Sequence, residues 1–127
     1  MQTSNRHPYH TRELAHAEDL DTLVASTADP VVLLEGIRAL PDSDVELVRQ
    51  FGRWVAERYP TAIFRTGNAP GTDTAFAEGV VAVAPERIQY VLPYTQHRKA
   101  WVASRASSFA LDTLPHVAER RLVDLPT

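Results

Sequence analysis

Residues 64–80 read FRTGNAPGTDTAFAEGV and contain the strand end, turn and helix start from which the fold is predicted. An apolar run at residues 62–64 leads into a turn-rich segment at residues 66–71, and a helical pattern opens at Thr72. A strand followed by a glycine-rich turn and a helix start directs backbone N–H groups and the positive end of the helix toward an anion. The pattern therefore predicts a phosphate or nucleotide site at this turn.

Two further apolar runs flank this unit and predict a parallel sheet. Residues 31–34 form an unbroken apolar run, which is typical of a strand buried on both faces. Residues 61–65 and 87–93 are the second and third predicted strands. Helical patterns are predicted at residues 11–25, 44–58 and 72–83, with weaker ones at 100–109 and 114–121. Ser43 and Glu46 have the spacing of a capping box at the start of the second helix.

Helices that alternate with apolar strands predict an α/β domain with three layers, in which right-handed crossovers connect a short parallel sheet. Three strands are expected, and residues 122–125 are the candidate for a fourth at the C-terminus. Residues 1–29 are predicted to be an arm and a helix, and residues 30–127 a single nucleotide-binding domain. The predicted core residues are Val32, Leu34, Val48, Phe51, Val55, Ile63, Phe76, Val80, Ile88 and Val91.

Composition limits the classes of protein that fit. The chain has 127 residues, of which 44% are hydrophobic and 23% charged, as in an ordinary globular domain. Its net charge of −3 argues against a general nucleic-acid binder, which usually carries a basic face. Cysteine is absent, which excludes disulfides and fits a reducing cytosol. We find neither a membrane-length apolar run nor a signal-peptide pattern, so a cytoplasmic protein with no membrane partner is expected. No metal and no cofactor are predicted.

Three loops follow the three predicted strands, at residues 35–38, 66–73 and 93–99. In an open parallel sheet, ligands bind beyond the carboxyl ends of the strands, so these loops are expected to converge on one site. Their glycines allow close backbone approach, their arginines suit anions, and a tyrosine could stack on a base. Thr72 or Asp73 also suits the role of a helix cap. The predicted ligand-binding residues are Gly36, Arg38, Thr66, Gly67, Asn68, Gly71, Thr72, Asp73, Pro93, Tyr94 and Arg98.

Three motifs in these loops resemble the SLOG superfamily. They are Gly36-Ile37-Arg38, the TGNAPGTD turn at residues 66–73 and Leu92-Pro93-Tyr94, and the resemblance covers residues 31–99. The superfamily comprises Rossmann-like domains related to DNA-processing protein A and to the "lonely guy" phosphoribohydrolases. The resemblance implies that a nucleotide-type ligand binds at the strand ends. By this resemblance, the residues that line the ligand site would be Gly36, Arg38, Thr66, Gly67, Asn68, Gly71 and Asp73.

The chain departs from the phosphoribohydrolase branch at one motif. That branch carries P-G-G-x-G-T-x-x-E after a later strand, and this sequence has no such motif. Pro70-Gly71-Thr72 resembles part of it, but Ala75 stands where the glutamate is required. The departure favours binding or sensing over phosphoribohydrolase activity.

Three functions remain open from the sequence, so whether the chain is an enzyme is left undecided. The first is binding or sensing of a nucleotide. The second is hydrolysis of an N-glycosidic or phosphate bond, with Asp73, Glu35 or His97 as the general acid or base. The third is single-stranded DNA binding through residues 97–101 and Arg105, which the acidic net charge disfavours.

A homodimer is also predicted from the sequence. A three-stranded sheet buries little surface, and the weakly patterned helices beyond Trp101 need a surface to cover them. The predicted assembly is therefore two copies of the chain.

Overall fold

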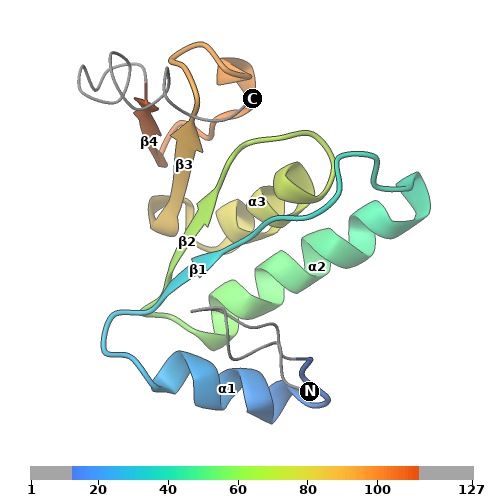
Figure 1. The fold of residues 1–127 in the computed structure, drawn as a ribbon, viewed down its shortest axis with the longest axis vertical. Helices are drawn as coiled ribbons and strands as arrows, with labels where there is room; N and C mark the ends of the chain where they lie inside the picture. Colours follow the sequence, from blue (N-terminus) through green and yellow to red (C-terminus); the bar gives the residue numbers. More distant parts are fainter. Residues whose placement is uncertain (1–12, 112–127) are drawn as a thin grey trace, which may run out of the picture.

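The computed structural model describes residues 13–111 (Figure 1). The elements are α1 (Ala17–Ala25), β1 (Val31–Leu33), α2 (Asp42–Arg58), β2 (Ile63–Thr66), α3 (Thr72–Val83), the 3-10 helix η2 (Pro85–Arg87), β3 (Ile88–Leu92), the 3-10 helix η3 (Lys99–Trp101) and β4 (Ser107–Ala110). The N-terminal arm at residues 1–12, the predicted helix at 114–121 and the candidate strand at 122–125 lie outside the described residues. No helix within the described residues is long and apolar enough to cross a membrane.

The sheet is parallel throughout, which confirms the predicted α/β, Rossmann-like fold class. Its strand order is β1-β2-β3-β4, so β1 and β4 are its edges. The fourth strand is Ser107–Ala110, and the helix predicted at residues 100–109 is therefore wrong. Strand preference depends strongly on context. The open edge of β3 supplies the hydrogen bonds that make this short, weakly patterned segment a strand.

Helices α2 and α3 both lie on one side of the sheet and pack against each other (Figure 1). The contact is close because each helix contributes a glycine to it. A Cβ atom built on Gly79 would lie 2.1 Å from the carbonyl oxygen of Arg49, and one built on Gly52 would lie 2.4 Å from that of Phe76. Beneath the helices, the buried residues of the sheet are Phe64, Thr66, Ile88, Tyr90 and Leu92.

The opposite face of the sheet is exposed and carries both apolar and polar side chains. Arg65 and Gln89 lie level with Leu33 on this face and hydrogen bond to each other. Leu33 is 62% exposed and Phe109 is 54% exposed, and strand register together with side-chain alternation puts them on the same face. Val31 and Val91 are also exposed.

The prediction that residues 31–34 are buried on both faces is therefore wrong. Within residues 13–111 the predicted third layer is also wrong, because no helix covers this face (Figure 1). Consecutive crossovers of one hand with sequential strand order place both crossover helices on the same face, and the unbroken apolar run gave no sign of this.

Two predicted core residues are exposed, Val91 and Phe51. Val91 belongs to the open sheet face. Phe51 lies on α2 and stacks on Trp54, with ring centroids 5.7 Å apart. The other predicted core residues are buried or half-buried. The periodicity therefore located the core of α2 and α3 correctly, with an error at the rim of α2.

The starts of the first two helices differ from their predictions. Helix α1 begins at Ala17, where the Asp19 carboxylate accepts hydrogen bonds from the amides of Ala15 and His16. Helix α2 begins at Asp42 with Pro41 as its N-cap, and no side chain caps it. The predicted Ser43–Glu46 capping box is therefore wrong. The extended backbone of Pro41 already forms the cap position, and its carbonyl accepts a bond from the Asp44 amide.

A network of polar contacts holds α1 to the end of α2. Two nitrogens of the Arg58 guanidinium each lie 2.6 Å from an oxygen of the Asp21 carboxylate, and the Tyr59 hydroxyl donates to Asp21 at 2.7 Å. The hydrogen bond from Arg58, followed by that from Tyr59, lowers the pKa of Asp21 from 3.8 to about 2. The carboxylate form of Asp21 is therefore favoured in the folded state.

Substitution of Asp21 with asparagine should flatten the acid end of the stability profile. Because the folded pKa of about 2 lies below the unfolded 3.8, the contribution of Asp21 is present above pH 3.8 and is lost as the pH falls toward 2. Urea unfolding at several pH values between 2 and 6 measures the slope. Asp21→Asn should show a smaller loss of unfolding free energy than wild type over this range. Equal slopes for Asp21→Asn and wild type would contradict the assignment.

Candidate functional site

The loop after β1 packs directly against the start of α3. Gly71, the N-cap of α3, has a φ of +82°, a conformation that side chains disfavour. A Cβ atom there would lie 2.2 Å from the carbonyl oxygen of Arg38. The Thr72 amide and hydroxyl both donate to the carbonyl of Ile37, at 3.0 and 2.9 Å. Two of the three predicted loops are therefore in contact.

This contact changes the role expected for the glycines. The turn was predicted to direct its backbone N–H groups toward an anion, but the Thr72 amide donates to the Ile37 carbonyl, so this prediction is wrong for Thr72. Gly36 also approaches Thr72, because a Cβ on Gly36 would lie 2.5 Å from the Thr72 Cγ2 atom. Gly36 and Gly71 thus allow one loop to approach the other. Arg38, in the same loop as Gly36, is exposed.

The turn at residues 66–71 closes around Asp73. The Asp73 carboxylate is buried and accepts a hydrogen bond of 3.3 Å from the Ala69 amide. Thr74 donates to the Ala69 carbonyl at 2.8 Å, and the Thr66 hydroxyl accepts from the Asn68 amide. The turn therefore holds a carboxylate of the chain itself beside the N-terminus of α3, where a phosphate was predicted.

Asn68 joins this turn to the third predicted loop. It has a φ of +62°, its side chain is 2% exposed, and its Nδ2 atom donates to the carbonyls of His97 at 3.4 Å and Arg98 at 3.1 Å. The three loops after β1, β2 and β3 are thus connected in series at the carboxyl ends of the strands. The Asn68 NH₂ group positions the backbone of Arg98, and the predicted contact of Asn68 with a ligand stays a prediction.

Arg98 is the arginine of the third predicted loop. Its guanidinium carbon lies 4.9 Å from the centroid of the Trp101 ring. Its Nη1 atom is buried and has no hydrogen-bond partner among the described residues. Pro93 and Tyr94 are exposed nearby in sequence, and the Tyr94 ring packs edge-on against His97 at 5.3 Å. A buried guanidinium N–H group without an acceptor costs folding free energy. The Nη1 atom therefore marks a position in these loops where an acceptor is missing.

A cavity of about 160 Å³ adjoins these loops on the helix side of the sheet. Of its lining residues, only Asn68 is a predicted ligand-binding residue, and Trp101 belongs to the segment of the DNA-binding hypothesis. The i, i+3 spacing of Arg98 and Trp101 is the sequence signal that could have found their stacking. The lining residues are Asn68, Thr74, Ala77, Glu78, Val81, Tyr90, Trp101 and Ala103.

A second cavity lies at the carboxyl ends of β3 and β4. Its volume is about 400 Å³, within the usual range for small-molecule sites. Lys99 and Thr95 contribute polar groups to walls that are otherwise largely apolar. Its place beside β4 was not foreseen, because no strand was predicted there.

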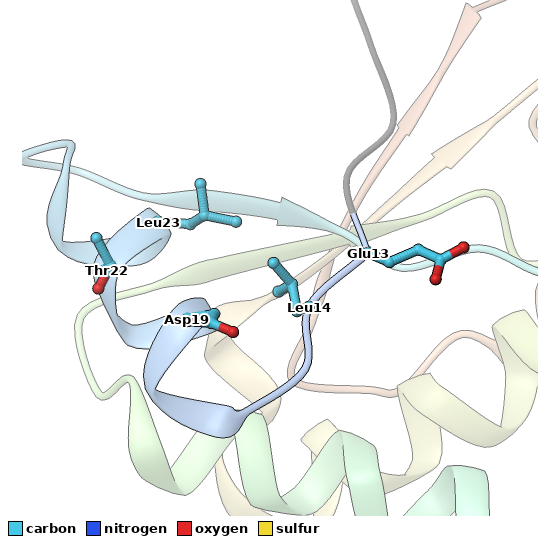
Figure 2. A pocket seen from close by; sticks show the side chains of 5 residues that line it. All are labelled: Glu13, Leu14, Asp19, Thr22 and Leu23. Atoms are coloured by element: carbon cyan, nitrogen blue, oxygen red, sulfur yellow. The ribbon is translucent and has the colours of Figure 1, made fainter.

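A third cavity, formed by α1 and the segment before it, carries less chemistry (Figure 2). Figure 2 shows Glu13 directed away from the other lining side chains, and the Asp19 carboxylate is occupied in capping α1. Helix α1 lies beside the amino ends of the strands, away from the three loops (Figure 1). Among residues 13–111, no three His, Cys, Asp or Glu side chains gather in a group that could hold a metal ion.

The three candidate acids and bases for hydrolysis lie in three different environments. Asp73 is buried in its turn, Glu35 is exposed, and the His97 ring packs against Tyr94. Arg105, a candidate for DNA contact, lies 3.6 Å from a carboxylate oxygen of Glu86.

Comparison with known proteins identifies no relative of this chain. No protein-family model matches the chain, and neither a curated protein nor a solved structure does. The resemblance to the SLOG superfamily stays a prediction from the three motifs.

Proposed function

We propose that this chain binds or senses a nucleotide or nucleotide-derived ligand at the carboxyl ends of β1, β2 and β3. The observation that carries the proposal is the Arg98 guanidinium, whose Nη1 atom is buried without a partner among the described residues. Arginine presents a planar fork of N–H donors that suits phosphate oxygens. A ligand phosphate would supply the missing acceptor and remove the cost of the unpaired donor.

The phosphate is expected at Arg98 and not at the start of α3. The Thr72 amide is already bonded to Ile37, and the Asp73 carboxylate would repel an anion at the turn. Asn68 fixes the backbone carbonyl of Arg98, so the side chain starts from a defined position. Trp101, which is 55% exposed, adds an aromatic surface beside the guanidinium.

Binding needs only these contacts, whereas hydrolysis also needs an activated acid or base. Asp73, the most buried candidate, accepts a bond from the Ala69 amide and so serves the turn. The hydrolase and DNA-binding alternatives stay hypotheses that no contact within residues 13–111 specifically favours.

A thermal-shift screen of the full chain tests the proposal. ADP-ribose, NAD, ATP and AMP are the probes, with inorganic phosphate and ribose as controls. At one hundred times its dissociation constant, a ligand that binds only the folded state adds about 2.7 kcal/mol to the free energy of unfolding. We expect at least one nucleotide to raise the melting temperature. No shift with any of them would contradict the proposal.

The proposal includes a homodimer, supported by the large apolar side chains exposed on the face of the sheet opposite α2 and α3, Leu33 and Phe109. Parallel sheets are normally covered on both faces. Light scattering of the full chain should report a dimer at micromolar concentration. Leu33→Glu should shift it toward the monomer, while Leu47→Glu, an exposed site on α2, should not. A wild-type monomer would contradict this part of the proposal.

A further inference from the structure

The small cavity between α3, β3 and residues 101–103 has room for one ring system. Its volume is about 160 Å³, whereas sites for whole drug-sized ligands measure roughly 300 Å³ or more. Ala77 and Val81 of α3 give it apolar walls. Trp101 adds a flat aromatic wall. The guanidinium carbon of Arg98 lies 4.9 Å from the centroid of the same ring. The cavity and the unpaired arginine therefore share one side chain.

The polar groups of this cavity have acceptor capacity left. Asn68 uses its NH₂ group for the carbonyls of His97 and Arg98, and since carbonyls only accept, this fixes the amide orientation and leaves its oxygen. The Thr74 hydroxyl donates its proton to the Ala69 carbonyl, so the hydroxyl oxygen can take part in a further hydrogen bond only as an acceptor. The cavity thus favours a ligand that brings N–H donors.

Glu78 extends the same pattern with a charge. Both bonds from Arg49 reach its Oε1 atom, at 3.2 and 2.9 Å. Its Oε2 atom makes none of the hydrogen bonds found within residues 13–111. Glu78 is one of the lining residues, and its side chain on α3 is 43% exposed. A free carboxylate oxygen accepts from the amino group of a ligand and repels a carbonyl.

We infer that this cavity binds the base of the proposed nucleotide, and that it selects a base with an exocyclic amine. The inference rests on the proposed function, in which Arg98 binds the phosphate. The base lies against the Trp101 ring, and its amine donates to Glu78. Replacement of the amine by an oxo group puts two acceptors face to face, so the 6-oxo or 4-oxo counterpart binds more weakly.

Two pairs of nucleotides test the inference by calorimetric titration of the full chain. AMP is compared with inosine monophosphate, and CMP with UMP, because each pair exchanges an exocyclic amino group for an oxo group. The adjacent ring nitrogen changes from an acceptor to an N–H donor at the same time, so the comparison reports where on the base the cavity requires a donor. Wild type should prefer the amino member of at least one pair tenfold or more. Glu78→Gln should reduce that preference to less than threefold, because the amide carries both a donor and an acceptor. Thermal unfolding checks that the variant is folded.

Glu86→Gln is the matched control, since Glu86 also pairs with an arginine, Arg105, but is not among the lining residues. It should keep the wild-type preference. Equal binding of amino and oxo nucleotides by wild type would overturn the base assignment, as would a preference that Glu78→Gln leaves intact. In both cases the proposed function survives. No binding of any nucleotide would overturn both.

Discussion

Substitution of Gly71 with valine is expected to destabilise the folded domain strongly. The position has a φ of +82°, and a Cβ atom would lie 2.2 Å from the Arg38 carbonyl oxygen. A β-branched residue held in this conformation costs about 1–3 kcal/mol, and overpacking against fixed backbone costs a further 1–3 kcal/mol. Together these costs should lower the free energy of unfolding by about 2–6 kcal/mol, which urea titrations measure.

Gly67→Ala is the matched control in the same turn. Its Cβ would lie 3.5 Å from the Asp73 carboxylate, which is an ordinary contact. This variant should unfold within about 1 kcal/mol of wild type. If both glycine variants were equally stable, the close packing of the β1 loop on the start of α3 would be wrong.

The sequence predicted the elements whose patterns are local. The apolar runs located β1, β2 and β3, and the 3.6-residue period located α2 and α3. The turn at residues 66–73 and its connection to the neighbouring loops were also predictable. Strand ends of a parallel sheet meet at one edge, so the loops that follow them are brought together.

Other features depend on partners that the sequence does not reveal. β4 forms because β3 has a free edge, and Leu33 is exposed because both crossover helices cover the other face. The Thr72 amide is occupied because the loop after β1 supplies a carbonyl from 35 residues earlier. A glycine-rich turn has the same sequence pattern whether its glycines allow a ligand or a second loop to approach. The sequence therefore could not distinguish a ligand site from a loop–loop contact.

Removal of the Arg98 side chain is expected to have the largest effect on ligand binding. A hydrogen bond to a charged group contributes about 1.5–3 kcal/mol, so Arg98→Ala should weaken nucleotide binding roughly 10-fold to 150-fold. The fold should be retained, because Asn68 holds the backbone carbonyl of Arg98 and not its side chain. Arg105→Ala, which removes an exposed arginine paired with Glu86, should bind as wild type does. Isothermal titration of the three proteins measures the difference.

The contact between Arg98 and a ligand phosphate is tested most directly by a double-mutant cycle. The strongest nucleotide from the thermal-shift screen and its phosphate-free nucleoside are each titrated into wild type and Arg98→Ala. If Arg98 binds the phosphate, loss of the phosphate should weaken binding to wild type by about 1.5–3 kcal/mol and should weaken binding to Arg98→Ala much less. Additive effects, with the phosphate contributing equally to both proteins, would contradict the account.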